Sequence, residues 1–262
     1  MKKKVLLTGG NGQLGTYLQR IAPEFSDQIN LVALSREKLD LAELGSIYEV
    51  IKNYHPDVVI NTAAYTAVDQ AEKERDLAML INGDAVGEIA KACNDIGASL
   101  IQISTDYVFN GQKNGAYLPD DPTDPINYYG ETKLKGEQLA LKHCSRAVIV
   151  RTSWVYSEVG KNFKLTMLNL FQKLETIKVI DDQTGRPTHA CDLARHCLQL
   201  AQKAPLESKT THFASPEIMT WYDFANKLLQ EVQKPVTKKI IPIPTSEYPT
   251  PAKRPRNSVL AI

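Results

Sequence analysis

The chain has 262 residues, of which 43% are hydrophobic and 23% are charged, and its formal net charge is +1. These values are typical of a globular protein that is long enough for one large α/β domain or for a domain with an appendage. A near-neutral charge gives no general reason to expect nucleic acid or an anionic membrane as a partner. No apolar run approaches the ~20 residues of a membrane span. The three apolar residues after the basic start are too few for a signal peptide.

Four cysteines stand at positions 93, 144, 191 and 197, without any Cys-x-x-Cys spacing. This pattern is typical of reduced thiols. Cys191 and Cys197 are expected to be ordinary residues of a helix. We therefore predict a cytoplasmic α/β protein.

The strongest local signal is a glycine-rich turn near the N-terminus. An apolar run over 3–8 is suited to a buried parallel strand, and a helical pattern then continues to Ile21. The glycines between them, Gly9-x-x-Gly12-x-x-Gly15, form a variant of the dinucleotide fingerprint in which the first two glycines are three positions apart rather than two. They allow the turn, the approach of a diphosphate and close helix–strand packing, and the helix N-terminus favours the anion. The predicted cofactor residues here are Gly9, Asn11, Gly12, Gln13, Leu14 and Gly15.

A second strand is predicted over 30–34, and Ser35 and Arg36 follow it, about 20 residues beyond the glycine turn. An acidic residue at this place would bind the ribose 2′-hydroxyl of NAD, whereas a hydroxyl and a guanidinium suit the 2′-phosphate of NADP. The pattern favours NADPH, with NADH as the alternative. Asp40 and Leu41 come next. Asp40 could contact adenine, or it could cap the helix expected from position 43 to about 54.

The remaining pattern alternates between strands and helices. Further buried strands are predicted over 56–61, 98–104 and 146–151, and helices over 70–80, 85–96 and 128–143. The alternation predicts an α/β fold with a Rossmann-type doubly wound parallel sheet. Three residues after the third strand are placed to line a cofactor at the carboxyl edge of the sheet, namely Ala63, Ala64 and Tyr65. The proline-containing segment 110–127 is expected to be a loop, either a substrate lid or a plain connection.

Tyr129 and Lys133 are four residues apart and share one face of the predicted helix. An ammonium there can stabilise a phenolate, whose parent phenol otherwise titrates near ~10, so that a tyrosine can transfer protons near neutral pH. Alone the spacing is weak, because it also occurs on solvated helix faces. Tyr128 is an equally good phenol, and only the spacing to Lys133 selects Tyr129.

Five motifs follow one another along the chain: TGGNGQLG, NTAAYTAVD, STDYVFNG, YGETK and RTSWVY. Together they resemble the extended short-chain dehydrogenase/reductases and, more narrowly, the dTDP-4-dehydrorhamnose reductase family. Matches at 162–163, 182–188 and 249–255 extend the resemblance over nearly the whole chain. It implies NAD(P)H-dependent reduction of the C4 ketone of dTDP-4-dehydro-β-L-rhamnose to dTDP-L-rhamnose, a step of nucleotide-sugar and polysaccharide biosynthesis.

The resemblance also implies roles for individual residues. Tyr129 would donate the proton to the ketone oxygen, Lys133 would hold the nicotinamide ribose and lower the tyrosine pKa, and Thr105 would polarise the carbonyl. Arg254 would bind the substrate diphosphate, because a guanidinium binds phosphate oxygens in pairs. The candidates for binding the substrate are Thr105, Asp106, Tyr128, Trp154 and Arg254. Without the resemblance, Trp154 would be a core residue and Thr105 a cap.

The C-terminal part predicts a smaller α/β substrate-binding domain. Residues 1–152 would form the dinucleotide-binding domain, with a returning segment near 176–200, and residues 153–262 would mainly bind substrate. Helices are expected over 161–174, 192–203 (capped by Asp192) and 221–233 (capped by Thr220), and strands over 177–180, 210–214 and 238–243. The family pattern continues for about another helix beyond Ile262, so either the chain is truncated at its C-terminus or its tail is naturally short. Some relatives form metal-bridged dimers; Mg²⁺ and a homodimer stay open, and no metal ligand is assigned.

Three alternatives compete with this interpretation. A dehydratase of the same superfamily would usually have an acidic residue after Asp106, where Tyr107 stands. An epimerase-reductase would need a second acid or base, for which His189 and Cys191 are candidates. A non-catalytic regulatory subunit, similar to the β subunit of methionine adenosyltransferase, would bind NADP without turnover. The intact Thr, Tyr and Lys set favours an enzyme.

Overall fold

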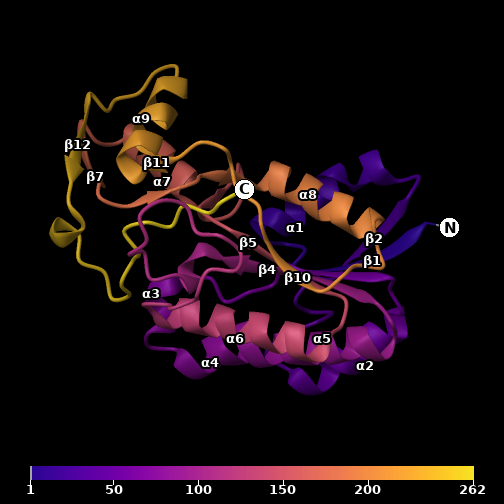
Figure 1. Cartoon of the computed structure of the whole chain (residues 1–262). Coiled ribbons are helices and arrows are strands. Elements are labelled where there is room, and N and C mark those ends of the chain that lie inside the picture. Colours follow the sequence, from indigo (N-terminus) through magenta and orange to yellow (C-terminus); the bar gives the residue numbers. More distant parts are fainter. Residues whose placement is uncertain (1) are drawn as a thin grey trace.

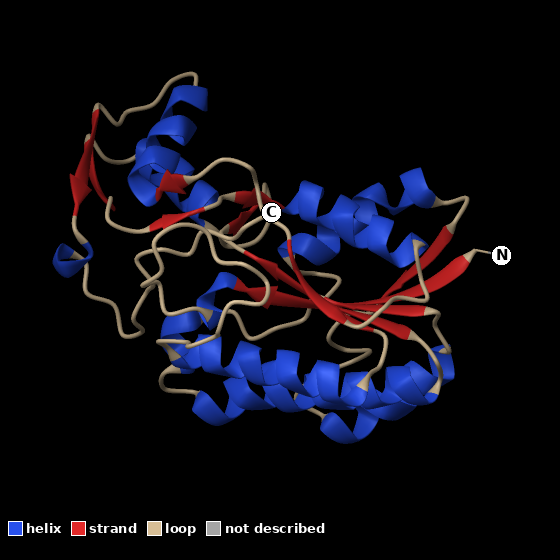
Figure 2. Cartoon of the chain, viewed as in Figure 1, coloured by secondary structure: helices blue, strands red, loops and turns tan. Residues whose placement is uncertain are grey.

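The computed structural model describes residues 2–262 and has a six-stranded parallel sheet at its centre (Figures 1 and 2). The strands lie in the order β10 (Lys209–His212), β5 (Ala147–Thr152), β4 (Ser99–Thr105), β3 (Val58–Asn61), β1 (Lys3–Thr8) and β2 (Ile29–Ala33). The strand order reverses at β1, which pairs with β2 on one side and β3 on the other. Ligands of open parallel sheets bind beside such a reversal point, at the carboxyl ends of the strands. The predicted doubly wound sheet is confirmed.

Helices cover both faces of the sheet (Figure 1). The side chains of β1 alternate, so that Val5 and Leu7 enter one apolar core while Leu6 enters the other. The first core includes residues of α1 (Gln13–Ile21) and α8 (Ala190–Gln202), and the second those of α2 (Leu44–Tyr54), α5 (Ala85–Asp95) and α6 (Tyr128–His143). Because both faces are covered, the strands are continuous apolar runs, which is why the sequence identified them.

The prediction of one continuous helix over 70–80 is wrong. It divides into α3 (Val68–Ala71) and α4 (Arg75–Met79), and a single π turn over Leu80–Asp84 then leads into α5. The backbone of Glu74 leaves the helical conformation, and its carboxylate accepts a hydrogen bond from the Tyr65 hydroxyl at 2.7 Å. The π turn directs Asn82 inward, where its amide bonds both backbone groups of Tyr65 and the Thr132 hydroxyl of α6. This amide fixes the segment after β3 against α6.

The cap predicted for α8 is also wrong. The helix begins at Ala190, and the His189 imidazole accepts the hydrogen bond from the backbone N–H of Cys191 at 3.1 Å. Asp192 lies within the first turn, where the positive end of the helix dipole still stabilises a carboxylate. An imidazole nitrogen can act as a cap, but Asp and Ser are the usual caps, so the sequence pattern favoured Asp192. Cys191 and Cys197 are ordinary residues of this helix, as predicted.

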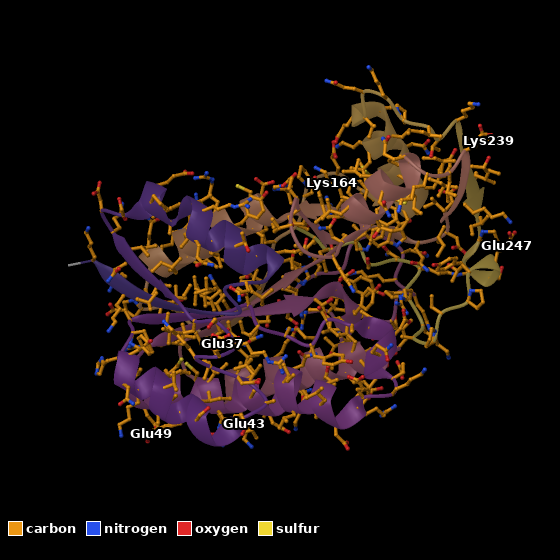
Figure 3. All side chains as sticks on the ribbon, turned by 180° about the vertical axis from the view of Figure 1, so that it is seen from behind. Glu37, Glu43, Glu49, Lys164, Lys239 and Glu247 are labelled. Atoms are coloured by element: carbon orange, nitrogen blue, oxygen red, sulfur yellow. The ribbon has the colours of Figure 1, made fainter. Side chains whose placement is uncertain are left out.

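A smaller unit lies beside the carboxyl edge of the sheet (Figures 1 and 2). Its elements are α7 (Phe163–Phe171), β7 (Thr176–Ile180), β8 (Thr184–Gly185), β11 (Met219–Thr220), α9 (Trp221–Glu231) and β12 (Lys239–Ile243). It has its own core around Phe171 and Phe224. Thr220 caps α9 through a complete capping box, as predicted. Figure 3 shows Lys239 and Glu247 on the outer side of this unit, both exposed.

Two further features complete the fold. A short pair of strands, β6 (Val155–Tyr156) and β9 (Thr188–His189), connects the sheet to the smaller unit. The loop over 110–127 lies against the C-terminal segment, where Asn257 donates to the carbonyls of Lys113 and Gly115 at 2.7 Å each and Tyr117 forms a bridge with Leu260. In the part of the chain that the structure describes, no helix is both long and apolar enough to span a bilayer.

Candidate active site

A cavity of about 700 Å³ opens at the carboxyl edge of the sheet, next to the smaller unit. Its lining comes from the residues that follow β1, β3, β4 and β5, from the start of α6 and from Trp221 of α9. The volume lies within the range of cofactor and ligand pockets in proteins. Strand ends far apart in the sequence therefore contribute side chains to one site.

The glycine turn forms one wall of this cavity. Gly9 has a φ of 68°, and a Cβ on Gly15 would lie 2.2 Å from the Gly9 carbonyl oxygen, so neither position tolerates a side chain without displacement. Gly12 is the N-cap of α1 and offers no side chain to cap the free N–H groups of the first turn. The first turn also contains no acidic residue. The turn thus fits a diphosphate, which is a double anion that needs both close approach and N–H donors.

The residues after β2 form a charged rim. The Arg36 Nε donates to the Asp40 carboxylate at 3.0 Å, and the side chain of Arg36 is 73% exposed. Hydrogen bonding by the Ala42 N–H, and then by Arg36, lowers the pKa of Asp40. Ser35 does not line the main cavity but an adjoining hollow that shares Arg36 and Asp40 with it. Asp40 does not cap α2, whose N-cap is Glu43.

Tyr129, Lys133 and Thr105 all line the cavity. The Asn127 side chain caps α6 by accepting from the Gly130 N–H at 2.8 Å. A Cβ on Gly130 would lie 2.2 Å from the carbonyl oxygen of Tyr107, so glycine here lets the start of α6 pack directly on the end of β4. This contact places Tyr129 beside Thr105.

The environment of Tyr129 differs from the expectation. Burial, followed by the charge of Asp106, raises the pKa of Tyr129, and a hydrogen bond with Thr105 acts in the opposite direction. The Lys133 ammonium instead donates to the Ile103 carbonyl at 2.7 Å. Burial lowers the pKa of Lys133 to about 8, although the nearby Glu137 opposes this shift. The phenol is therefore firmly protonated at neutral pH, rather than activated by Lys133 as the spacing suggested.

Two buried oxygens of cavity residues have no partner that meets hydrogen-bond geometry among the described residues, although the Ser258 hydroxyl lies close enough to the Asp106 carboxylate to lower its pKa. They are Oδ2 of Asp106 and Oγ1 of Thr152. The other oxygen of Asp106 accepts from the Thr105 hydroxyl at 2.9 Å, and burial raises the pKa of Asp106 to about 6.

Two of the predicted tyrosines do not line the cavity. The hydroxyl of Tyr65 bonds to Glu74, and its backbone is fixed by Asn82. The ring of Tyr128 lies under the guanidinium of Arg75, at 3.7 Å from its centroid. The structure therefore separates Tyr128 from Tyr129, its neighbour in the sequence, and brings only Tyr129 to the cavity.

Arg254 also lies outside the cavity lining. Its two terminal nitrogens donate to the Asp69 carboxylate at 2.5 and 2.8 Å, and the guanidinium contacts the Tyr107 hydroxyl. Tyr107 itself does line the cavity, with its ring 5.9 Å from that of Tyr129. The pair with Asp69 thus holds Arg254 one side chain away from the site.

The comparisons with known proteins agree with this geometry. The family model described as "RmlD substrate binding domain" matches residues 2–262. The dTDP-4-dehydrorhamnose reductase of Shigella flexneri is 41% identical over 98% of this chain and 88% of its own length. This chain belongs to the dTDP-4-dehydrorhamnose reductase family.

Solved structures from this family have the same fold. The dTDP-4-dehydrorhamnose reductase of Bacillus anthracis, in complex with NADP, superposes with a TM-score of 0.93 at 37% identity and covers 100% of this chain and 91% of that one. The ortholog from Clostridium acetobutylicum gives 0.92 at 38% identity, over 98% of this chain and 90% of that one. A relative with a different printed name is the Bacillus subtilis spore coat polysaccharide biosynthesis protein SpsK, 39% identical over 98% of this chain and 89% of its own length.

Some residues that line the cavity were not indicated by the motifs of the reductase family. Trp221 stacks on Trp154 with ring centroids 3.4 Å apart and planes at 4°. The backbone of Trp154 has a φ of 48°, and a Cβ on Gly185 would lie 2.4 Å from its indole. Tyr107 and Lys161 are further lining residues that the sequence did not single out. The only sequence signal for the position of the Trp154 ring was Gly185, because a glycine indicates that another group packs closely there but does not say which group.

Proposed function

We propose that this chain reduces the C4 ketone of dTDP-4-dehydro-β-L-rhamnose to dTDP-L-rhamnose, with NADPH as the cofactor. The observation that carries the proposal is the single cavity into which the glycine turn, Thr105, Tyr129 and Lys133 all converge. The curated reductases at 40–41% identity, of whose length this chain covers 88%, supply the substrate class.

NADPH, when bound, supplies the hydride to the ketone carbon. The neutral phenol of Tyr129 donates its proton to the ketone oxygen, because an alkoxide is a stronger base than a phenolate. The Thr105 hydroxyl, whose one proton is donated to Asp106 Oδ1 in this structure, would turn that proton to the ketone oxygen when the substrate binds and so stabilise the growing charge. Lys133, whose pKa of about 8 leaves it largely cationic at neutral pH, compensates the phenolate that remains. Asp106 and Trp154 bind the sugar.

The preference for NADPH rests on Ser35 and Arg36 at the rim of the cavity and on the NADP bound by the Bacillus anthracis relative. We assign no step to Mg²⁺, since residues 2–262 bring no three His, Cys, Asp or Glu side chains into a metal-binding group. His189 and Cys191, the candidates for the second acid or base of an epimerase-reductase, are absent from the cavity lining.

We also propose a division of the chain into a cofactor-binding part and a substrate-binding part. The sheet with its helices would bind NADPH and the smaller unit would bind the nucleotide sugar. In this division α8 and β10 belong with the sheet, because β10 pairs with β5 and α8 packs in the core beneath β1. The cytoplasm is the proposed location, supported by four cysteines that are all free. A homodimer stays open.

The test is the product. Purified protein, NADPH and dTDP-4-dehydrorhamnose formed in situ should consume one NADPH per sugar and yield dTDP-rhamnose, identified by mass spectrometry and by NMR of C4. NADPH binding without any turnover would reject the enzyme in favour of the regulatory alternative.

A further inference from the structure

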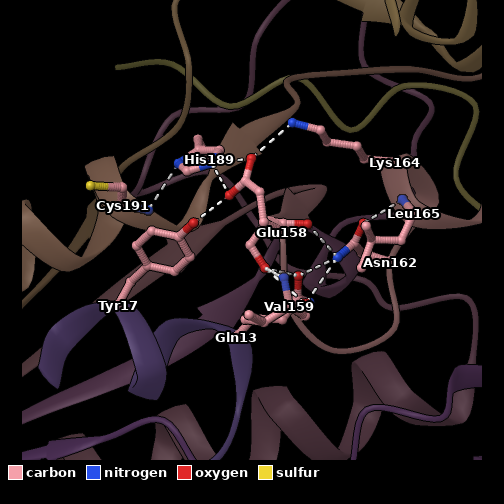
Figure 4. Close-up of polar contacts among 10 residues, drawn as sticks. Gln13, Tyr17, Glu158, Val159, Asn162, Lys164, Leu165, His189 and Cys191 are labelled. Atoms are coloured by element: carbon pink, nitrogen blue, oxygen red, sulfur yellow. Dashed lines mark hydrogen bonds and ion pairs between the residues drawn. The ribbon is translucent and has the colours of Figure 1, made fainter. Parts of the chain in front are cut away.

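The segment over 157–162, between β6 and α7, lies against the start of α1 (Figure 4). The side-chain oxygen of Gln13 accepts hydrogen bonds from the Ser157 hydroxyl at 2.8 Å and from the Asn162 amide at 2.9 Å. A Cβ on Gly160 would lie 3.1 Å from Gln13 Cγ, so the backbone at Gly160 packs closely against the Gln13 side chain. Gln13 is the first residue of α1 and directly follows Gly12, the glycine that lets the backbone approach the diphosphate. The segment is thus fastened to the diphosphate site itself.

A second set of contacts holds the outer side of the same segment (Figure 4). The Glu158 carboxylate accepts hydrogen bonds from the Tyr17 hydroxyl of α1, from Lys164 at 2.8 Å and from the His189 Nε2 at 3.1 Å. These contacts, Lys164 first, lower the pKa of Glu158 to about 2, so the carboxylate is charged at any physiological pH. Together with the Gln13 bonds they keep the segment in one position relative to α1.

This arrangement carries Lys161 to the cavity, where it is exposed. The cavity lining contains three cationic side chains: Arg36, Lys133 and Lys161. Arg36 pairs with Asp40, and Lys133 donates to the Ile103 carbonyl. No ion pair found among residues 2–262 includes Lys161. It is therefore the one cavity cation in this range without a carboxylate or carbonyl partner.

We infer that Lys161, which lines the cavity next to the start of α1, binds the diphosphate of NADPH. This inference rests on the proposed use of NADPH. The helix N-terminus supplies only about half a positive charge to the two negative charges of a diphosphate, and an ammonium would raise the compensation to about one and a half. The cofactor diphosphate is favoured over that of the nucleotide sugar because the segment is anchored on Gln13, which directly follows the N-cap Gly12 of the glycine turn.

The test compares Lys161→Met with the wild-type protein in calorimetric titrations of three probes: NADPH, adenosine 2′-monophosphate and dTDP. The adenosine probe has the 2′-phosphate but no diphosphate. We expect the Kd for NADPH to rise roughly ten- to hundred-fold, the range of one lost hydrogen bond to a charged group. The Kd values for the other two probes should stay within about twofold. Lys161→Arg should restore most of the NADPH affinity.

Lys173→Met is the matched control, because Lys173 is exposed shortly after α7 and does not line the cavity. It should leave all three Kd values unchanged. An NADPH affinity that is unchanged in Lys161→Met overturns the inference, and so does a loss seen only with dTDP, which would assign Lys161 to the nucleotide sugar. A wild-type protein that fails to bind NADPH would instead reject the proposed function.

Discussion

The substitution Glu137→Gln tests the buried ion pair between Glu137 and Arg151, which lies next to the proposed catalytic residue Lys133. Glu137 follows Lys133 by one turn of α6, and its carboxylate accepts hydrogen bonds from the Ser104 hydroxyl at 2.5 Å and from Arg151 at 2.9 and 2.7 Å. The two side chains of the pair are 3% and 5% exposed. Glutamine keeps the shape but removes the charge that the guanidinium needs. We expect a loss of roughly 3 kcal/mol in the free energy of unfolding, at the lower end for a buried pair deprived of one partner.

The same substitution should change the pH dependence of catalysis. Burial lowers the pKa of Lys133 from an ordinary 10.5 to about 8, and Glu137 opposes that shift, so its removal lowers the pKa further. In the wild type, kcat/KM for NADPH should fall as the pH rises through about 8, where Lys133 loses its proton. In Glu137→Gln this high-pH limb should move to lower pH. Because the pKa of Lys133 is lower in the folded protein than in the unfolded chain, Lys133 contributes to the free energy of unfolding in a pH-dependent way. This contribution is fully present above about pH 10.5 and is lost as the pH falls through about 8.

The assay combines urea unfolding with pH–rate profiles of NADPH oxidation. Glu131→Gln is the matched control on the same helix, since Glu131 is 49% exposed and lies 3.9 Å from Arg75. It should change the free energy of unfolding by less than about 0.5 kcal/mol and leave the profile unchanged. A Glu137→Gln protein that is less stable but keeps the wild-type high-pH limb would refute the electrostatic coupling to Lys133 and leave the pair with a structural role alone.

Three other substitutions give distinct expectations. Gly15→Ala should raise the Kd for NADPH at least tenfold in a calorimetric titration, because its Cβ would meet the Gly9 carbonyl at 2.2 Å; an unchanged Kd would contradict the assigned turn. Arg36→Ala should lower the ratio of kcat/KM for NADPH over NADH about tenfold, and an unchanged ratio would show that another group selects the cofactor. Trp221→Phe should abolish the coupled near-ultraviolet circular dichroism of the only two tryptophans and raise the KM for the nucleotide sugar, with the KM for NADPH as the internal control.

The features that the sequence predicted correctly are local ones. The inner strands of the sheet are apolar because helices cover both faces. Gly15 is required by a contact with Gly9, which is only six positions away. The start of α6 was also predictable, since Asn127 precedes it as a cap. Tyr129 could be preferred over Tyr128 from helical spacing alone, and the structure brings only Tyr129 to the cavity.

The features that were missed depend on contacts between distant parts of the chain. Trp221 opens a helix of the smaller unit and becomes a cavity residue only because that unit packs against Trp154. Arg254 is held by Asp69, 185 positions away, so its separation from the cavity has no local signal. The pKa of Tyr129 is set by burial and by Asp106, two effects of the folded cavity that helical spacing to a lysine does not report.

The central claim is that Tyr129 delivers the proton in a cavity that also binds NADPH. Its most direct measurement compares Tyr129→Phe with the wild type in two assays, NADPH binding by calorimetry and turnover of dTDP-4-dehydrorhamnose. The account predicts a Kd for NADPH within a few-fold of the wild type and a kcat reduced by about 10²–10⁴, the usual contribution of a general acid. A Tyr129→Phe protein with wild-type kcat would contradict the assignment of the proton donor.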